Sequence, residues 1–312
     1  MTGRIAVLIP CYNEEAAISG VIASLAAALP GAAITVIDNN STDATAERAR
    51  AAGARVLHEA RQGKGHAVRR GFADVEADIY LLVDGDGTYD PTAAPAMVAL
   101  LARGQLDMVT GTRVSGTRAA YRPGHRAGNH MLTGLVGAIF GREVSDLLSG
   151  YRVFSRRFVK SFPALAEGFE TETEFTVHAL ELAMPIAELP TAYGERARGS
   201  ASKLNTWRDG MRILRTVAVL AKQERPLQLF SLAAAVLILA GLALGLPVVA
   251  EFMRTGLVPR LPTAVLALGL VLLGFLSIAC GLILDSVARG RREMKRLAYL
   301  AIPGPPPETG ES

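Results

Sequence analysis

The stretch Ile79-Tyr80-Leu81-Leu82-Val83-Asp84-Gly85-Asp86-Gly87 decides the fold of the first part of the chain. Five apolar residues lead directly into two carboxylates that lie two positions apart. An apolar run of this length between turn signals is typical of a strand that is buried on both faces, as in a parallel sheet. We therefore expect Asp84 and Asp86 at the carboxyl end of the strand, where open α/β sheets bind their ligands.

Two carboxylates at this spacing suggest a cation. They repel each other unless a positive ion joins them, and their oxygens are ligands that Mg²⁺ and Mn²⁺ prefer. Gly85 and Gly87 would let a ligand approach the backbone closely. We expect Asp84 and Asp86 to hold Mg²⁺ or Mn²⁺ together with a diphosphate. A solvated acidic turn would show the same Asp-X-Asp spacing, so the spacing alone does not establish a metal site.

Apolar runs and helical segments alternate along the first 110 residues. The pattern predicts strands at 5–9, 33–37, 55–58, 79–83 and 107–110, and helices at about 15–29, 45–52, 62–75 and 91–103. Such alternation is typical of an α/β fold with a mostly parallel, Rossmann-like sheet that is covered on both faces.

Polar residues follow the predicted strands at the same end. The loops at 10–14, 38–43, 63–65 and 84–87 are rich in Asp, Asn and Gly, which favours a nucleotide-binding crevice. Lys64 lies between two glycines and could meet a phosphate there, although Gly-Lys-Gly also occurs as a simple turn. The spacing of a P-loop is absent.

Two long segments near the end of the chain carry no charge. Leu229 to Ala250 has 22 residues and Leu261 to Leu284 has 24. At about 1.5 Å per residue they would span roughly 33 and 36 Å, against a hydrocarbon core of about 30 Å. The pattern predicts a membrane hairpin with a short linker at 251–260. A pair of buried core helices is the alternative.

The net charge of +4 is unevenly distributed. Residues 1–203 carry 21 Lys and Arg against 22 Asp and Glu, whereas residues 204–312 carry 12 against 7. The basic excess therefore favours anionic lipid headgroups as partners and not nucleic acid. Arginine and lysine flank both spans, so the positive-inside rule predicts a cytoplasmic-membrane protein with both termini and the domain before the spans in the cytoplasm. Cys11 and Cys280 fit a reducing compartment without disulfides.

Several motifs together resemble a known family. The ordered set is Pro10-Cys11-Tyr12-Asn13-Glu14, Asp38-Asn39-Asn40-Ser41-Thr42-Asp43, Gly63-Lys64-Gly65 and Asp84-Gly85-Asp86. This order resembles the family 2 glycosyltransferases, which have the GT-A fold. Later segments are similar to the polyprenyl-phosphate (dolichol-phosphate) mannose and glucose synthases: Gly111-Thr112-Arg113, Arg126-Ala127-Gly128-Asn129, Asp146 to Arg152, and Ser202-Lys203-Leu204. The resemblance covers roughly residues 4–222, and bacterial members also end in a membrane hairpin.

The resemblance implies roles for particular residues. The nucleotide sugar would be bound by Pro10, Tyr12, Asn13, Glu14, Asp38, Lys64 and Asp84. Asp84 and Asp86 would hold the metal, and Arg113, Arg126, Ser202 and Lys203 would bind the acceptor phosphate. The residues implied in catalysis are Asp86, Arg113, Arg126 and Lys203. Many relatives read Gly-X-Ser-Lys before this lysine, whereas Gly199-Ser200-Ala201-Ser202-Lys203 has one more residue, which leaves open whether Ser200 or Ser202 corresponds.

The expected activity follows from this resemblance. An inverting transferase would move a hexose from a nucleotide diphosphate sugar, of the GDP-mannose or UDP-glucose type, to undecaprenyl or dolichyl phosphate. The expected domains are a catalytic domain at 1–204, an amphipathic juxtamembrane helix at 205–226, a transmembrane hairpin at 227–285, and a basic tail at 286–312 whose end is disordered. Paired hairpins are also compatible with a homo-oligomer.

Two other functions remain open from the sequence. A phosphate monoester has a second pKa of about 6, so it needs no base, whereas a hydroxyl acceptor would need one. Glu170, Glu172 and Glu174 are candidates for that base, and acids that favour a helix N-terminus are the alternative explanation. A catalytically silent scaffold that binds nucleotide sugar is the other hypothesis.

Overall fold

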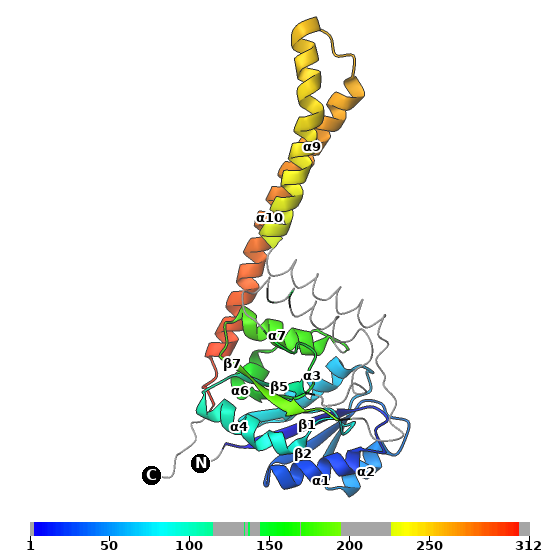
Figure 1. The fold of residues 1–312 in the computed structure, drawn as a ribbon, viewed down its shortest axis with the longest axis vertical. Coiled ribbons are helices and arrows are strands. Elements are labelled where there is room, and N and C mark those ends of the chain that lie inside the picture. Colours follow the sequence, from blue (N-terminus) through cyan, green and yellow to red (C-terminus); the bar gives the residue numbers. More distant parts are fainter. Residues whose placement is uncertain are drawn as a thin grey trace. The chain divides into compact units, whose positions relative to one another are not determined.

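The structure is a computed structural model, and it describes residues 3–114, 134, 137, 144–168, 170–194 and 226–305. Contacts divide the chain into two compact units, of which the first combines Met1–Val217 with Lys295–Ser312 and the second is Ala218–Met294. The first unit contains the sheet, and the second contains most of two long helices (Figure 1).

The first unit is built on a seven-stranded sheet with the order β3-β2-β1-β4-β6-β5-β7. The strands are β1 Ile5–Cys11, β2 Ala33–Asp38, β3 Arg55–His58, β4 Ile79–Leu82, β5 Met108–Val114, β6 Arg152–Ser155 and β7 Ile186–Ala192. Only β6 runs antiparallel to its neighbours β4 and β5, so the predicted mostly parallel sheet is confirmed. The strands predicted from the sequence end at residue 110, so they include neither β6 nor β7.

Helices cover both faces of the sheet, and each face has its own apolar core. The helices are α1 Ile18–Ala28, α2 Thr45–Ala51, α3 Lys64–Asp74, α4 Ala94–Arg103, α6 Arg156–Ser161 and α7 Thr171–Glu181, with a short 3₁₀ helix, η1, at Pro91–Ala93. α1, α2 and α4 bury side chains such as Ile22 and Leu101 on one face. α3, α6 and α7 bury Phe72, Phe158 and Phe175 on the other. Each predicted element begins within three residues of its observed start.

The strand directions define a functional edge. β1, β2 and β4 are parallel, and β5 has the same direction because β6 is antiparallel to both β4 and β5. The carboxyl ends of these four strands therefore share one edge of the sheet. The polar loops that follow Cys11, Asp38 and Leu82 all leave from this edge, as the sequence predicted.

The end of the chain packs against the first unit. α10 (Leu261–Leu300) continues far beyond its uncharged segment. The Tyr299 hydroxyl donates to Oδ2 of the fully buried Asp107 at 2.8 Å, and Lys295 Nζ lies 2.6 Å from Oε2 of Glu181. The contacts of Lys295 and Tyr299 lie within the first unit, which includes Lys295–Ser312, and the basic tail expected at 286–312 stays a prediction. The sequence predicts disorder for residues 303–312, of which 306–312 lie outside the described part of the chain.

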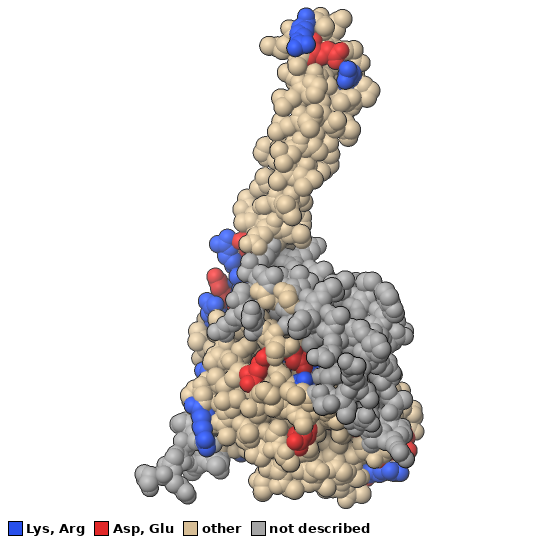
Figure 2. All heavy atoms as spheres, in the orientation of Figure 1, with Lys and Arg blue, Asp and Glu red and all other residues tan. Residues whose placement is uncertain are grey.

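The second unit contains a pair of apolar helices, α9 (Pro226–Thr255) and α10 as far as Met294. Both have a mean hydropathy of 2.6 over 18 residues and are long enough to cross a membrane by length and composition. Figure 2 shows a hairpin surface almost free of charge, with charged side chains at the turn. There Arg260 Nε lies 3.4 Å from Glu251 Oε2.

Small residues at seven-residue spacing join these two helices. Ala234, Gly241 and Val248 are buried on α9, and Ala267, Gly274, Gly281 and Ala288 are buried on α10. A Cβ on Gly274 would lie 2.5 Å from Ile238 Cγ1 and 3.2 Å from the carbonyl oxygen of Ala234. Inside a lipid bilayer, helices have no hydrophobic reason to associate, so close packing at such small residues would stabilise the hairpin there.

Replacing Gly274 should therefore separate the helices. We expect Gly274→Leu to lower the melting temperature of the detergent-solubilised protein by several degrees, because the side chain overlaps Ile238. Gly269→Leu on the same helix is the matched control, since a Cβ at Gly269 has no neighbour within 4 Å. Size-exclusion chromatography after stepwise heating measures both, and equal melting curves for the two variants would contradict this packing.

A buried histidine links the stability of the first unit to pH. His178 on α7 is 2% exposed, its Nε2 lies 3.1 Å from Ser161 Oγ, and its ring packs edge-on against Phe158 and Phe162. Burial lowers the pKa of His178 to about 3, and the charge of Lys295 acts in the same direction. The unfolded chain binds this proton near its ordinary pKa of about 6.5. Between these values the unfolded state holds more protons, so acidification destabilises the fold.

We accordingly expect the free energy of unfolding to fall as the pH drops below 6.5, by about 1 kcal/mol per pH unit from this group. His178→Gln keeps a polar contact for Ser161 but cannot bind the proton, so its melting temperature should change less between pH 7 and pH 5. Differential scanning fluorimetry of both proteins measures the slopes. Parallel slopes would show that His178 does not carry the acid sensitivity.

Candidate active site

Lys64 forms the centre of a buried cluster at the functional edge. Its Nζ lies 2.5 Å from Asp84 Oδ1 and 2.5 Å from Glu172 Oε1, and its side chain is 8% exposed. Burial by itself would lower the pKa of Lys64, but the charges of Asp84 and Glu172 and their hydrogen bonds raise it well above its ordinary value. Burial raises the pKa of Glu172, and Asp84 adds to this, because one ammonium group serves two carboxylates.

The two glycines beside Lys64 allow the backbone to cross closely. Gly65 N donates to the carbonyl oxygen of Glu167 at 3.0 Å, and a Cβ on Gly65 would lie 2.1 Å from the carbonyl oxygen of Ala166. Gly63 has a φ of 144°, which L-residues rarely adopt. The Gly63-Lys64-Gly65 turn therefore packs directly against the backbone of residues 166–167, before α7. This packing directs Lys64 to Asp84 and Glu172.

Gly150 packs against the same cluster from the loop before β6. A Cβ there would lie 2.6 Å from Asp84 Oδ2 and 2.9 Å from Lys64 Nζ. Gly150 N donates to the hydroxyl of buried Tyr89 at 2.8 Å, which holds the backbone in this place. The loop between residues 146 and 150 is thus in van der Waals contact with one of the predicted metal ligands.

Asp86 is the second carboxylate of the motif, and it is 4% exposed. Its Oδ1 accepts from Thr88 N at 3.1 Å and from Thr88 Oγ1 at 2.7 Å, so Thr88 fixes the orientation of the carboxylate. Within the described residues no group of three His, Cys, Asp or Glu side chains could hold a metal. A pair of carboxylates fits Mg²⁺ or Mn²⁺, which typically takes its other ligands from phosphates and water.

The predicted nucleotide residues lie at the ends of β1 and β2. Asn13, with a φ of 54°, accepts from Thr42 N at 2.8 Å, and Asn13 N donates to Ser41 Oγ at 3.0 Å. Glu14 is buried, and its N donates to Thr45 Oγ1. These bonds join the two loops into one surface. Half-buried Pro10 and Tyr12 lie on the first of them.

Asp38 and its neighbour Asn39 order the second loop. Asp38 Oδ1 accepts from Ser41 N at 3.3 Å, and its Oδ2 lies 3.3 Å from Nδ1 of His58 on β3. Asn39 donates to the carbonyl oxygen of Arg61 at 2.6 Å and accepts from Gly63 N at 2.7 Å. Asn39 thereby holds the chain that enters the Lys64 turn. Sequence reasoning did not single it out, although its place directly after the strand was a signal.

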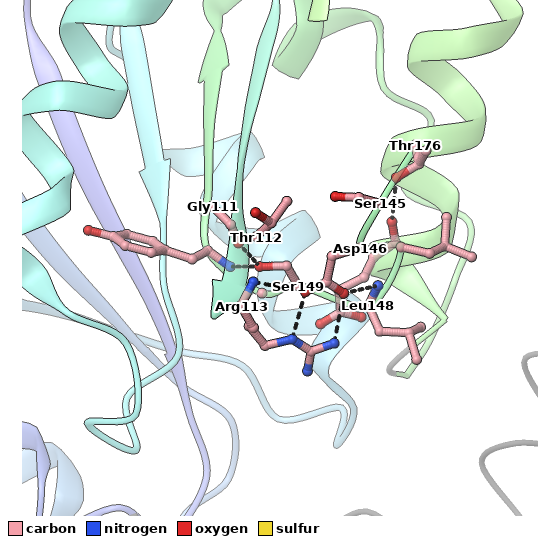
Figure 3. A network of polar contacts seen from close by, with 12 residues as sticks. Gly111, Thr112, Arg113, Ser145, Asp146, Leu148, Ser149 and Thr176 are labelled. Atoms are coloured by element: carbon pink, nitrogen blue, oxygen red, sulfur yellow. Dashed lines mark hydrogen bonds and ion pairs between the residues drawn. The ribbon is translucent and has the colours of Figure 1, made fainter. Parts of the chain in front are cut away.

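Arg113 is held by Asp146 in a two-pronged pair (Figure 3). Nε donates to Asp146 Oδ2 at 2.8 Å and Nη2 donates to Oδ1 at 2.7 Å, and the guanidinium lies 5.6 Å from the centre of the Tyr193 ring. Burial alone would raise the pKa of Asp146, but Arg113 holds it below its ordinary value. The pair holds the guanidinium of Arg113, the arginine predicted to bind phosphate, in one orientation at the end of β5.

Several predicted residues lie outside the described part of the chain. They are Arg126, Ser202, Lys203 and all but the last residue of the juxtamembrane helix predicted at 205–226. Among the candidates that are described, Asp84, Lys64 and Arg113 gather around the loop 146–150, which contacts Asp84 at one end and Arg113 at the other.

The structure distinguishes the three glutamates at the start of α7. Both oxygens of Glu174 accept backbone N–H groups, from Leu165 and Ala166 at 2.9 Å each. Glu170 is buried, and its Oε2 has no partner among the described residues. Only Glu172 contacts Lys64, so it is the member of the three that belongs to the site.

Comparison with known proteins agrees with this geometry. The model of the family "Glycosyl transferase family 2" matches residues 6–162. Glycosyltransferase AglJ of Haloferax volcanii is 34% identical over 95% of this chain and 98% of its own. A dolichyl-phosphate hexose transferase of the same organism is 30% identical, over 71% of this chain and 95% of its own. The chain belongs to glycosyltransferase family 2, and it is a glycosyltransferase.

Solved structures show the same fold. Glucosyl-3-phosphoglycerate synthase from Mycobacterium tuberculosis, crystallised with Mn²⁺, UDP-glucose and phosphoglyceric acid, is 27% identical, with a TM-score of 0.57. The match covers 70% of this chain and 80% of that chain. The expected GT-A fold is therefore confirmed for the first unit, and the resemblance to polyprenyl-phosphate hexose synthases agrees with the archaeal relatives.

The contact between Gly150 and Asp84 can be tested directly. We expect Gly150→Ala to lower kcat/KM by about a hundredfold, because the new Cβ displaces Asp84 or Lys64 by a sizeable fraction of an ångström. Gly20→Ala on α1 is the control, since a Cβ there meets nothing within 4 Å. Initial rates at several Mn²⁺ concentrations measure the effect, and wild-type kinetics in Gly150→Ala would refute the role of this contact.

Proposed function

We propose that this protein transfers a hexose from a nucleotide diphosphate sugar to a polyprenyl phosphate, with inversion at the anomeric carbon, at the cytoplasmic face of a membrane. One combination of features supports this most: a family 2 site and two helices able to cross a membrane lie in the same chain. The 30% identical relative named dolichyl-phosphate hexose transferase supports a lipid phosphate as the acceptor.

The donor would bind along the functional edge. Pro10, Tyr12, Asn13, Glu14 and Asp38 would line the nucleoside, and Asp84 and Asp86 would hold Mg²⁺ or Mn²⁺ beside the diphosphate. The Mn²⁺ and UDP-glucose of the mycobacterial structure support such a donor complex. The ion would supply positive charge to the departing diphosphate. Lys64 would act through Asp84, by holding one carboxylate oxygen at 2.5 Å.

Charge on the described side chains supports the need for an ion. The cluster contains four carboxylates (Asp84, Asp86, Asp146 and Glu172) against three cations: Lys64 and Arg113, which form direct ion pairs, and buried Arg152, whose charge acts on Glu172 and Asp146. An excess of negative charge repels both a diphosphate and a lipid phosphate. A divalent cation offsets this excess, and Arg126 and Lys203 would add further positive charge for the acceptor, with Ser202 as a hydrogen-bond donor.

The acceptor explains why no base is needed. A phosphate monoester is largely a dianion at neutral pH, with a second pKa of about 6. One of its oxygens would attack the anomeric carbon while the bond from that carbon to the diphosphate oxygen breaks. No proton moves in this step. The protein's task would be to bring two anions together, and Arg113, which Asp146 orients, would contribute to it.

A hydroxyl acceptor is the second candidate function. Glu172 favours it, because burial raises the pKa of this carboxyl group and would make it a better base near neutral pH. Its pairing with Lys64 favours a positioning role instead. The membrane topology, the domain limits at residues 204, 226 and 285, and self-association through the hairpin stay predictions.

A transfer assay tests the proposal. Membranes containing the protein would receive undecaprenyl phosphate, Mn²⁺ or Mg²⁺, and separately radiolabelled GDP-mannose, UDP-glucose or UDP-N-acetylglucosamine. We expect one donor to give an organic-extractable product that EDTA abolishes and that falls at least a hundredfold in Asp86→Ala. Donor hydrolysis without a lipid product would discard the acceptor, and no reaction with any donor would favour the silent scaffold.

The pH dependence distinguishes the two acceptors. With a phosphate acceptor, the rate should rise through about pH 6 as the monoester loses its second proton. The same inflection should persist in Glu172→Gln, even if the overall rate is lower. If Glu172 is a base for a hydroxyl acceptor, the rise with pH should disappear in this variant.

A further inference from the structure

Arg152, the first residue of β6, is a fully buried cation that the proposed reaction does not use. Its described surroundings contain no carboxylate within ion-pair distance of the guanidinium. Burial lowers the pKa of Arg152 to about 10, while the charges of Glu172 and Asp146 oppose this shift, so the group remains charged at neutral pH. A buried charge without a direct partner is costly, so its hydrogen bonds must hold it in place.

Three of these hydrogen bonds go to one loop and one helix, and a fourth goes from Nη1 to Met108 Sδ on β5 at 3.3 Å. Nε donates to the carbonyl oxygen of Ser149 at 3.0 Å, and Nη2 donates to that of Leu147 at 2.9 Å. Nη1 donates to Thr176 Oγ1 of α7 at 2.9 Å, and the guanidinium lies 5.6 Å from the centre of the Phe175 ring. Arg152 thus fastens the loop 146–150 to the helix that carries Glu172.

The same loop contacts both halves of the site. At its start, Asp146 accepts two hydrogen bonds from the Arg113 guanidinium (Figure 3) and a third from the Arg113 backbone N–H. At its end, Gly150 packs on Asp84. Between them, Ser149 Oγ donates to the carbonyl oxygen of Gly111. Five consecutive residues therefore set the separation between the phosphate-binding arginine and the metal-binding carboxylate.

We propose that Arg152 is a positioning residue: by holding the loop 146–150 against α7, it fixes Arg113 relative to Asp84 for the transfer step. This rests on the proposed function, in which Arg113 binds the acceptor phosphate and Asp84 the donor diphosphate. A displacement of about 1 Å between reacting groups can lower a rate about a hundredfold. A shift of this loop should therefore lower kcat more than it weakens donor binding.

Thr176→Val tests this without removing the charge. It has the shape of threonine, but it leaves one N–H of Arg152 without its acceptor. Thr173→Val on the same helix is the matched control, because Thr173 Oγ1 is buried and has no partner among the described residues. The full-length protein in detergent is assayed for transfer to undecaprenyl phosphate, with donor binding measured by isothermal titration calorimetry and the melting temperature measured in parallel.

We expect kcat in Thr176→Val to fall about tenfold while the donor Kd changes less than about threefold, and Thr173→Val to match the wild type. Arg152→Lys keeps the charge but cannot reach all three acceptors, so it should show the larger loss of kcat. If Thr176→Val lowers only the melting temperature and keeps kcat per folded molecule, Arg152 is structural and the inference fails. A wild-type protein that transfers nothing to the lipid phosphate refutes the proposed function itself.

Discussion

The site depends on one buried ammonium group between two carboxylates. Lys64 joins Asp84, at the end of β4, to Glu172, on α7, across the sheet edge. Opposite charges in a poorly solvated place attract strongly, but only if the partners are held at contact distance. Gly65 and Gly150 provide this closeness, because any side chain at either position would overlap a backbone oxygen or the cluster itself. These glycines thus allow the backbone to pack closely around the charged Lys64 side chain.

A second pair, Arg113 with Asp146, repeats the principle at the end of β5. The loop between residues 146 and 150 connects the two pairs, and buried Arg152 donates hydrogen bonds to two of its carbonyl oxygens. Asp84 and Asp146 therefore each have a cation that orients the carboxylate before any substrate binds. Fixed charges of this kind need little reorganisation during reaction, which is the main way in which proteins stabilise charge that develops in a transition state.

The apolar hairpin uses a different interaction. Its helices have no charge to pair over most of their length, and small residues at seven-residue spacing bring the two backbones close. The chain then returns to the first unit, where Tyr299 and Lys295 bind the buried carboxylates Asp107 and Glu181. Residues 192 positions apart in the sequence thus share one partly buried hydrogen bond.

The sequence by itself determined the alternation of strands and helices, the two apolar spans, and the placement of Asp38 and Asp84 at one sheet edge. These features arise from local patterns of hydrophobicity and from strand direction, which are written in consecutive residues. Tertiary structure alone decided that Glu172 and not Glu174 meets Lys64, that Asp146 orients Arg113, that β6 runs antiparallel between β4 and β5, and that Tyr299 reaches Asp107. Each of these contacts joins residues far apart in the chain. Their partners are selected by packing geometry and by the cost of leaving a buried charge unpaired, and neither has a signal in the local sequence.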